Sequence, residues 1–128
     1  MTTYLITGGA GSLGTALIEQ IFIKEPESTI RILDNNEHRL SLLKDKRIRK
    51  LYGNVADKDR VIRATHNADI VVHCAALKNI EISEYNTSEL IKSNIIGTDN
   101  VLSSCMDNNV KKVMFISSDK AVEPTSLY

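Results

Sequence analysis

Three glycines near the start of the chain, Gly8, Gly11 and Gly14, restrict the fold more than any other feature of the sequence. They follow a short apolar run, Tyr4–Thr7, and precede apolar residues at helical spacing, so the pattern predicts a strand, a tight turn and a helix. In such a turn glycine permits the bend, lets the backbone approach a pyrophosphate and lets the helix pack on its strand. The free N–H groups at the helix start would then face phosphate oxygens, although glycines can also serve only as turn formers.

Strand and helix patterns alternate along the rest of the chain. Strands are expected at residues 30–34, 47–52, 69–73 and 113–117, and the continuous apolar run at 69–73 is typical of a strand buried on both faces. The basic residues in 47–52 indicate an edge strand. Helices are expected between the strands, the longest over 86–109, where one apolar stripe comprises Ile91, Ile95, Leu102 and Met106. The alternation predicts an α/β fold of the Rossmann type, with a doubly wound parallel sheet of about five strands.

Asp34 stands at the end of the second predicted strand, 20 residues after Gly14. A carboxylate at this place can accept hydrogen bonds from both ribose hydroxyls of a dinucleotide, and it would repel a 2′-phosphate. Because no arginine immediately follows Asp34, the sequence favours NAD over NADP. Asp34 could instead cap the following helix, as could Asn35–Asn36. Further candidate caps are Asp57 and the pair formed by Asn86 and Glu89.

Composition excludes several classes of protein. The chain has 128 residues, of which 42% are hydrophobic and 25% charged, as is ordinary for one soluble domain. Lys plus Arg equals Asp plus Glu at 16 each, so no net charge attracts nucleic acid or an anionic membrane. The two cysteines and three histidines form neither a disulfide framework nor a metal-ligand pattern. No signal-peptide or membrane-span pattern is present at the N-terminus, so a cytoplasmic location is expected.

Several further segments resemble motifs of the extended short-chain dehydrogenase/reductases, and within them of the nucleotide-sugar dehydratases of the CapD-type polysaccharide biosynthesis family. These segments are residues 53–57, 73–78, 84–86, 92–98 and 117–122, the last followed by Pro124 and the most specific of the set. The resemblance spans nearly the whole chain. It implies a UDP-N-acetylglucosamine-type 4,6-dehydratase of surface polysaccharide or glycan biosynthesis. Residues 1–128 would then be its NAD(P)-binding domain, truncated before the substrate domain.

The resemblance also assigns cofactor contacts. The implied cofactor-binding residues are Gly8, Gly11, Ser12, Leu13, Gly14, Asp34, Asn35, Asn54, Val55, Ala75, Ala76, Leu77, Lys78 and Asn94. Two of these places depart from the family pattern. Flagellin-type members tend to have a Ser-Arg pair for NADP where this chain has Asp34-Asn35, and Asn54 replaces the usual aspartate of the adenine contact. As alternatives, Ala75–Leu77 could be a packed strand end, Lys78 a solvated lysine and Asn94 an ordinary polar residue on a helix flank.

Four catalytic residues are implied by the same resemblance. Tyr128 would take the proton of the sugar's carbon 4 hydroxyl, and Ser118 would hydrogen-bond that hydroxyl. Lys120 would remove the proton at carbon 5, and Asp119 would protonate the hydroxyl that leaves carbon 6. Asp119 and Lys120 could alternatively form a solvated turn before Pro124.

Two weaker alternatives remain beside a dehydratase. Simple epimerases of the same fold usually carry serines or small residues in place of Asp119 and Lys120, so an epimerase is less favoured. A stand-alone NAD-binding module is the other alternative. The lysine that the family places four residues after Tyr128 lies beyond this chain, so the polypeptide is expected to bind cofactor without turnover. A nucleotide-sugar substrate and a homo-oligomer are expected of the full-length enzyme.

Overall fold

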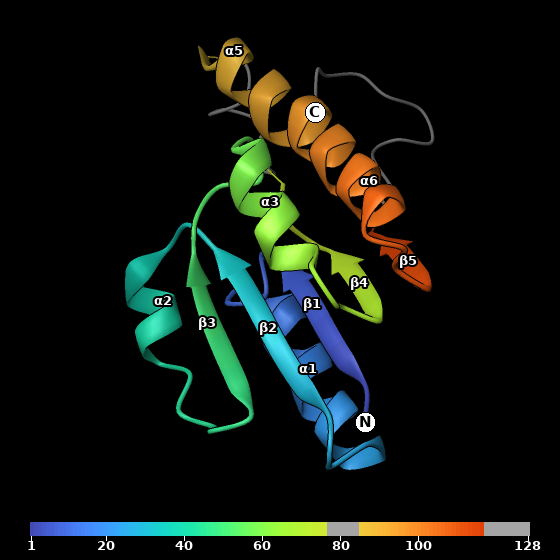
Figure 1. Cartoon of the computed structure of the whole chain (residues 1–128). Helices are drawn as coiled ribbons and strands as arrows, with labels where there is room; N and C mark the ends of the chain where they lie inside the picture. Colours follow the sequence, from blue (N-terminus) through green and yellow to red (C-terminus); the bar gives the residue numbers. More distant parts are fainter. Residues whose placement is uncertain (77–84, 117–128) are drawn as a thin grey trace.

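A five-stranded parallel sheet runs through the structure, in the order β3-β2-β1-β4-β5 (Figure 1). The computed structural model describes residues 1–76 and 85–116. Each predicted strand is present with slightly different bounds, and the doubly wound Rossmann-type fold is confirmed. The basic strand lies at an edge of the sheet, also as predicted. The strands are β1 (Thr3–Thr7), β2 (Thr29–Asp34), β3 (Ile48–Tyr52), β4 (Ile70–His73) and β5 (Lys112–Phe115).

Helices pack on both faces of the sheet (Figure 1). On one face lie α1 (Ser12–Lys24) and α2 (Glu37–Ser41), and on the other lie α3 (Lys58–Thr65) and α6 (Gly97–Asp107). Successive side chains of a strand point to opposite faces, and β1 shows the result. Its Ile6 packs in the same cluster as Ile18 of α1, whereas Leu5 packs in the cluster that contains Val61 of α3 and Val101 of α6. The core is therefore two apolar layers separated by the sheet.

Side chains cap two of the helices as the sequence predicts. Asn36 accepts a hydrogen bond from the Arg39 N–H at 3.0 Å at the start of α2. Asp57 accepts one from the Arg60 N–H at 3.3 Å at the start of α3. Asn86 is the N-cap residue of α5 (Thr87–Leu90), but its side chain makes no cap hydrogen bond, so the predicted capping box is wrong.

The long helix predicted over residues 86–109 has an irregular middle. After α5 the chain passes directly into a π-helical segment, Ile91–Ile96, and then into α6. An i→i+5 turn holds more residues than an α-helical turn, so the faces before and after it are out of register with a 3.6-residue period. The predicted apolar stripe is exposed both in this segment and in α6, with Ile95 62% and Met106 72% exposed. The helix packs instead through Leu90, Val101 and Cys105.

Both cysteines are buried. Cys74 belongs to the apolar cluster on the α1 face and Cys105 to the cluster on the α3 and α6 face, so the sheet separates them. Burial raises the pKa of the Cys105 thiol to about 11. In the part of the chain that the structure describes, no helix is long and apolar enough to cross a membrane.

Candidate functional site

The glycine turn joins β1 to α1 and leaves no room for side chains at two positions. Gly8 has a φ of 67°, and a Cβ on it would lie 2.8 Å from the backbone N of Ala75. A Cβ on Gly14 would lie 2.4 Å from the Cα of Gly9. Both distances are shorter than real Cβ contacts. Glycine is therefore needed at Gly8 for its backbone conformation and its approach to the end of β4, and at Gly14 because α1 starts directly against the turn.

The start of α1 is open to an anionic ligand. Gly11 is the N-cap residue and supplies no side-chain cap, and the first turn contains no acidic residue. The unpaired N–H groups and the positive end of the helix dipole attract an anion at such a place. A Cβ on Gly11 would lie 3.3 Å from the Gly8 carbonyl oxygen, a longer distance than those at Gly8 and Gly14. The absence of that side chain leaves space for a ligand instead.

Asp34 ties the end of β2 to the glycine turn. Its Oδ2 accepts a hydrogen bond from the Ala10 N–H at 3.1 Å, and its Oδ1 accepts one from the Asn36 N–H at 2.9 Å. The Gly8 N–H also donates to the Leu33 carbonyl at 2.7 Å. The cap of α2 is Asn36, so the alternative role of Asp34 as a helix cap is wrong. Each carboxylate oxygen has a further lone pair that can accept a hydrogen bond from a ligand hydroxyl.

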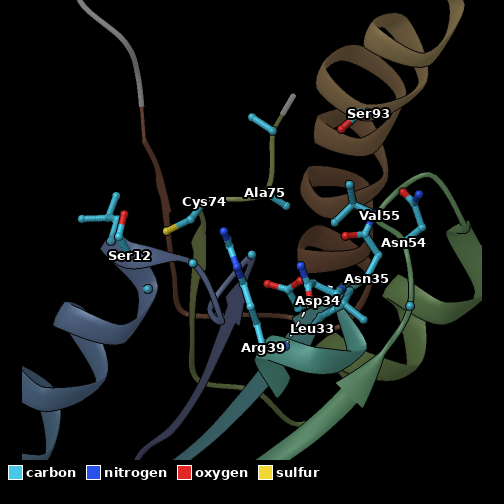
Figure 2. Close-up of a pocket in the computed structure, with 17 residues that line it drawn as sticks. Ser12, Leu33, Asp34, Asn35, Arg39, Asn54, Val55, Cys74, Ala75 and Ser93 are labelled. Atoms are coloured by element: carbon cyan, nitrogen blue, oxygen red, sulfur yellow. Dashed lines mark hydrogen bonds between the residues drawn. The ribbon is translucent and has the colours of Figure 1, made fainter. Parts of the chain in front are cut away.

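The glycine turn, Asp34 and the chain that follows β3 and β4 line a cavity of about 380 Å³ (Figure 2). It lies at the carboxyl ends of the parallel strands, beside β1, where the strand order reverses between β2 and β4. Open α/β sheets bind ligands at this switch point. The volume is within the range of pockets for small organic ligands. The geometry therefore fits a ligand that has both an anionic part, at α1, and hydroxyl groups, at Asp34.

Most of the predicted cofactor-binding residues lie on this cavity. Those on its lining are Gly8, Gly11, Ser12, Leu13, Gly14, Asp34, Asn35, Asn54, Val55, Ala75 and Ala76. Asn94 does not line it, whereas the neighbouring Ser93 of the π-helical segment does. The other predicted site residues lie outside the described residues: Leu77, Lys78, Ser118, Asp119, Lys120 and Tyr128.

Other lining residues are not predicted from the sequence. These are Leu33, Asn36, Arg39, Gly53, Cys74 and Ser93. Leu33, Gly53 and Cys74 adjoin predicted contacts along the chain, so their presence could have been inferred from those neighbours. Ser93 lies in the motif segment 92–98, next to the predicted contact Asn94, whereas Arg39 reaches the cavity from α2 and no motif spacing in the sequence signals this reach.

A chain of hydrogen bonds connects the end of β4 to the glycine turn and to the π-helical segment. The Thr7 hydroxyl lies 2.6 Å from Nδ1 of His73, and Nε2 of His73 lies 3.2 Å from the Thr98 hydroxyl. Thr98 donates its only hydroxyl proton to the Asn94 carbonyl at 2.6 Å. The Thr98 oxygen must therefore accept from His73, which places the ring proton on Nε2. The Thr7 hydroxyl then donates to Nδ1 while it accepts from the Ala75 N–H at 3.3 Å.

This chain of hydrogen bonds requires a neutral His73. A protonated ring would present a second N–H to the Thr7 hydroxyl, which already accepts from backbone amides. His73 is only 6% exposed, and burial lowers the pKa of its ring to about 4. Through these hydrogen bonds the neutral ring fixes the position of Ala75, on the cavity lining, relative to the helix that carries Ser93.

Known sequences resemble the chain over nearly its whole length. A family model described as polysaccharide biosynthesis protein matches residues 4–128. An uncharacterized membrane protein of Methanocaldococcus jannaschii is 43% identical over 129 residues, covering 98% of this chain. A UDP-N-acetylglucosamine 4,6-dehydratase (inverting) of Campylobacter jejuni is 38% identical over 128 residues, covering 97%. A UDP-glucose 4-epimerase of Rickettsia felis is 35% identical over 129 residues, covering 95%. The chain spans 38% of the length of each of these relatives.

Solved structures resemble the chain over the same region. Pen from Bacillus thuringiensis has a TM-score of 0.92 and 37% identity, and the match covers 98% of this chain and 40% of Pen. DesIV of Streptomyces venezuelae, a dTDP-glucose 4,6-dehydratase solved with NAD bound, has a TM-score of 0.77 and 27% identity. That match covers 88% of this chain and 38% of DesIV. The resemblance to nucleotide-sugar dehydratases of the short-chain dehydrogenase/reductase type is therefore confirmed for this part of their fold.

The requirement for a neutral His73 predicts how stability depends on pH. The unfolded ring protonates near its ordinary pKa of 6.5, whereas the folded ring resists protonation until a pH of about 4. The neutral ring's contribution to the free energy of unfolding is therefore fully present above pH 6.5. It is lost as the pH falls from 6.5 to about 4, and the total loss is on the order of 3 kcal/mol. The difference in unfolding free energy between the wild type and His73→Gln, measured by urea unfolding, should shrink by this amount over that range.

His66→Gln, at an exposed residue, is the matched control: the hydrogen bonds of His73 stay intact in it, so it should still lose the stability that depends on His73 as the pH falls from 6.5 to about 4. Parallel curves for the wild type and His73→Gln would contradict the account. If His73→Gln does not fold, titration of the ring by NMR in the wild type decides the matter: a midpoint near 6.5 instead of about 4 would contradict it equally.

Proposed function

The chain belongs to the family of polysaccharide biosynthesis proteins, and on this premise we propose that residues 1–128 form the NAD(P)-binding domain of a nucleotide-sugar 4,6-dehydratase. One observation carries the proposal. The cavity brings the uncapped start of α1 together with the Asp34 carboxylate at the end of β2. N–H groups at a helix start suit a pyrophosphate, and a carboxylate at this strand end suits the hydroxyls of a ribose. A dinucleotide carries both groups, joined to each other.

The proposed cofactor is NAD, with NADP less favoured because of Asp34. The carboxylate would accept hydrogen bonds from the ribose hydroxyls while its position stays fixed by the amides of Ala10 and Asn36. Ala75 and Ala76, which follow β4, also line the cavity, and their small side chains would let the backbone approach the nicotinamide ribose. The NAD bound in DesIV supports this choice by analogy. When bound, NAD would accept a hydride from the sugar and later return it.

The proposed substrate is a UDP-N-acetylglucosamine-type nucleotide sugar in surface polysaccharide or glycan biosynthesis. A hydride would leave carbon 4 for the cofactor, water would be lost across carbons 5 and 6, and the hydride would then return to carbon 6 while carbon 5 regains a proton. Tyr128 and Ser118 are proposed to act at the carbon 4 hydroxyl. Lys120 is proposed to take the proton from carbon 5, and Asp119 to protonate the leaving hydroxyl. The relative from Campylobacter jejuni, a 4,6-dehydratase that is 38% identical, supports this assignment.

An epimerase of the same fold is the second candidate. The relative from Rickettsia felis favours it, since that protein is a UDP-glucose 4-epimerase and is 35% identical. The pair Asp119 and Lys120 disfavours it, because an acid and a base beside each other are needed for loss of water and not for inversion at carbon 4. We therefore rank the dehydratase first.

A homo-oligomer and a cytoplasmic location stay predictions. The apolar side chains of Ile95 and Met106 are exposed on the long helix, and Met114 is 56% exposed on the edge strand β5. Exposed apolar groups at such places are compatible with contact between copies of a protein.

Gly11 offers a direct test of dinucleotide binding. Gly11→Val would place a branched side chain where the backbone is proposed to approach the pyrophosphate, while its closest protein neighbour, the Gly8 carbonyl, lies 3.3 Å from the new Cβ. We expect affinity for NAD, measured by calorimetry, to fall at least about tenfold, equal to a loss of about 1.4 kcal/mol. Ala16→Val on the exposed side of the same helix is the control and should bind NAD as the wild type does. Unchanged binding to Gly11→Val would refute the proposed pyrophosphate site.

Product analysis tests the proposed reaction. The full-length protein, incubated with NAD and UDP-N-acetylglucosamine, should yield a nucleotide sugar that is lighter than the substrate by one water, as seen by mass spectrometry. Lys120→Ala should abolish that product while NAD binding persists. An isomer with the mass of the substrate would support the epimerase instead, and would overturn the dehydratase assignment.

A further inference from the structure

The loop that follows β3 forms one end of the cavity. Along the sheet, the glycine turn follows β1, Asp34 ends β2, and residues 53–55 follow β3. Asn54 and Val55 are on the cavity lining together with Asp34 (Figure 2). The Gly53 N–H donates to the Asp34 carbonyl at 3.0 Å, which joins the loop to the end of β2. A dinucleotide with its pyrophosphate at α1 and a ribose at Asp34 would therefore have the base of that ribose at residues 53–55.

The peptide group between Val55 and Ala56 is held from both sides. Its carbonyl accepts a hydrogen bond from Nδ2 of Asn100 at 2.9 Å, and its N–H donates to Oδ1 of Asn54 at 2.9 Å. Asn100 lies on α6 and is buried, so water does not replace its hydrogen bond. Gly97 of the same helix adds a steric limit, because a Cβ there would lie 2.5 Å from Cγ2 of Val55. The first turn of α6 therefore determines the position of the loop.

The N–H of Val55 is available to a ligand. Val55 is on the cavity lining, while its side chain belongs to the apolar cluster on the α3 and α6 face. Within residues 1–76 and 85–116 its N–H donates no hydrogen bond. The edge of adenine that lies farthest from the ribose carries a ring nitrogen acceptor, N1, beside an amino donor. A backbone N–H at the end of the base can donate to that acceptor.

We propose that Asn100 is a positioning residue for recognition of the adenine base, because its hydrogen bond to the Val55 carbonyl holds the loop against which the base lies; this rests on the proposed dinucleotide function. A carbonyl only accepts, so the amide nitrogen of Asn100 must face it. Loss of this donor would leave a buried carbonyl unpaired, and the loop would move to pair it. Asn100 is not on the cavity lining, so its effect on the base passes through the loop.

Calorimetric titration with NAD and with nicotinamide hypoxanthine dinucleotide tests this role. The analogue keeps the riboses, the phosphates and the purine ring, but its oxo group and its protonated N1 reverse donor and acceptor along the far edge of the base. We expect the wild type to bind NAD more tightly than the analogue, because the Val55 N–H meets an acceptor only in NAD. Asn100→Leu, which keeps the size of the side chain, should lower the affinity for NAD by about tenfold and the affinity for the analogue by much less.

Asn108→Leu is the matched control. Asn108 lies at the other end of α6, where its Nδ2 donates to the Ile62 carbonyl at 3.0 Å and to the Thr65 hydroxyl at 2.8 Å. Both variants lose an amide that joins α6 to a neighbouring carbonyl, so both should lower the stability of the fold. Asn108 is away from the cavity lining, so Asn108→Leu should keep the preference of the wild type for NAD over the analogue.

Each other outcome has a defined meaning. Equal losses of affinity for the two dinucleotides in Asn100→Leu would overturn the proposal, because Asn100 would then serve only the stability of the fold. Unchanged NAD affinity, or a wild type without preference for NAD, would also overturn it while the dinucleotide site stands. If the wild type bound neither dinucleotide, the proposed function itself would fail. If Asn100→Leu does not fold, Asn100→Ser, whose hydroxyl is too short to reach the Val55 carbonyl, should show the reduced preference, and an unchanged preference would contradict the proposal.

Discussion

The hydrogen-bonded connection between the glycine turn and the end of β2 is the interaction on which the rest of the site depends. Two hydrogen bonds make it, from the Gly8 N–H to the Leu33 carbonyl at 2.7 Å and from the Ala10 N–H to the Asp34 carboxylate at 3.1 Å. Because α1 begins directly after the turn, these two hydrogen bonds also determine where the helix start lies relative to Asp34. Gly14 packs directly against Gly9, so α1 starts in contact with the turn. An anion site and a hydroxyl acceptor are thereby held in one cavity.

The other wall of the cavity depends on a buried polar network. Thr7 at the end of β1 contacts His73 at the end of β4, and His73 contacts Thr98 on the long helix. Buried polar groups are costly unless every donor and acceptor is paired, and here a single tautomer of His73 satisfies the whole chain of hydrogen bonds. The network joins the sheet to the helix where the helix changes from π to α geometry. Irregular helical turns of this kind often lie at functional sites.

Sequence patterns were sufficient for the fold and for much of the cavity. β4 could be predicted from its continuous apolar run. The glycine turn could be predicted because it stands between a strand pattern and a helix pattern. Asp34 could be predicted because its distance from Gly14 follows from the length of one helix and one strand. The π-helical segment could not be predicted, since its residues fit the pattern of an ordinary α-helix equally well. Arg39 could not either, because its reach into the cavity depends on the position of α2 and not on adjacency to Asp34.

The central claim is that the start of α1 and the neighbouring end of β4 receive a dinucleotide together. Backbone NMR of the protein during titration with NAD tests this most directly. The account predicts that the amide resonances of Ser12, Leu13 and Gly14 shift with the resonance of Ala75, and that these amides exchange more slowly with solvent at saturation. If these resonances stay unchanged while those near Arg60 and Arg63, which line a second cavity beside α3, respond to NAD, the claim is contradicted.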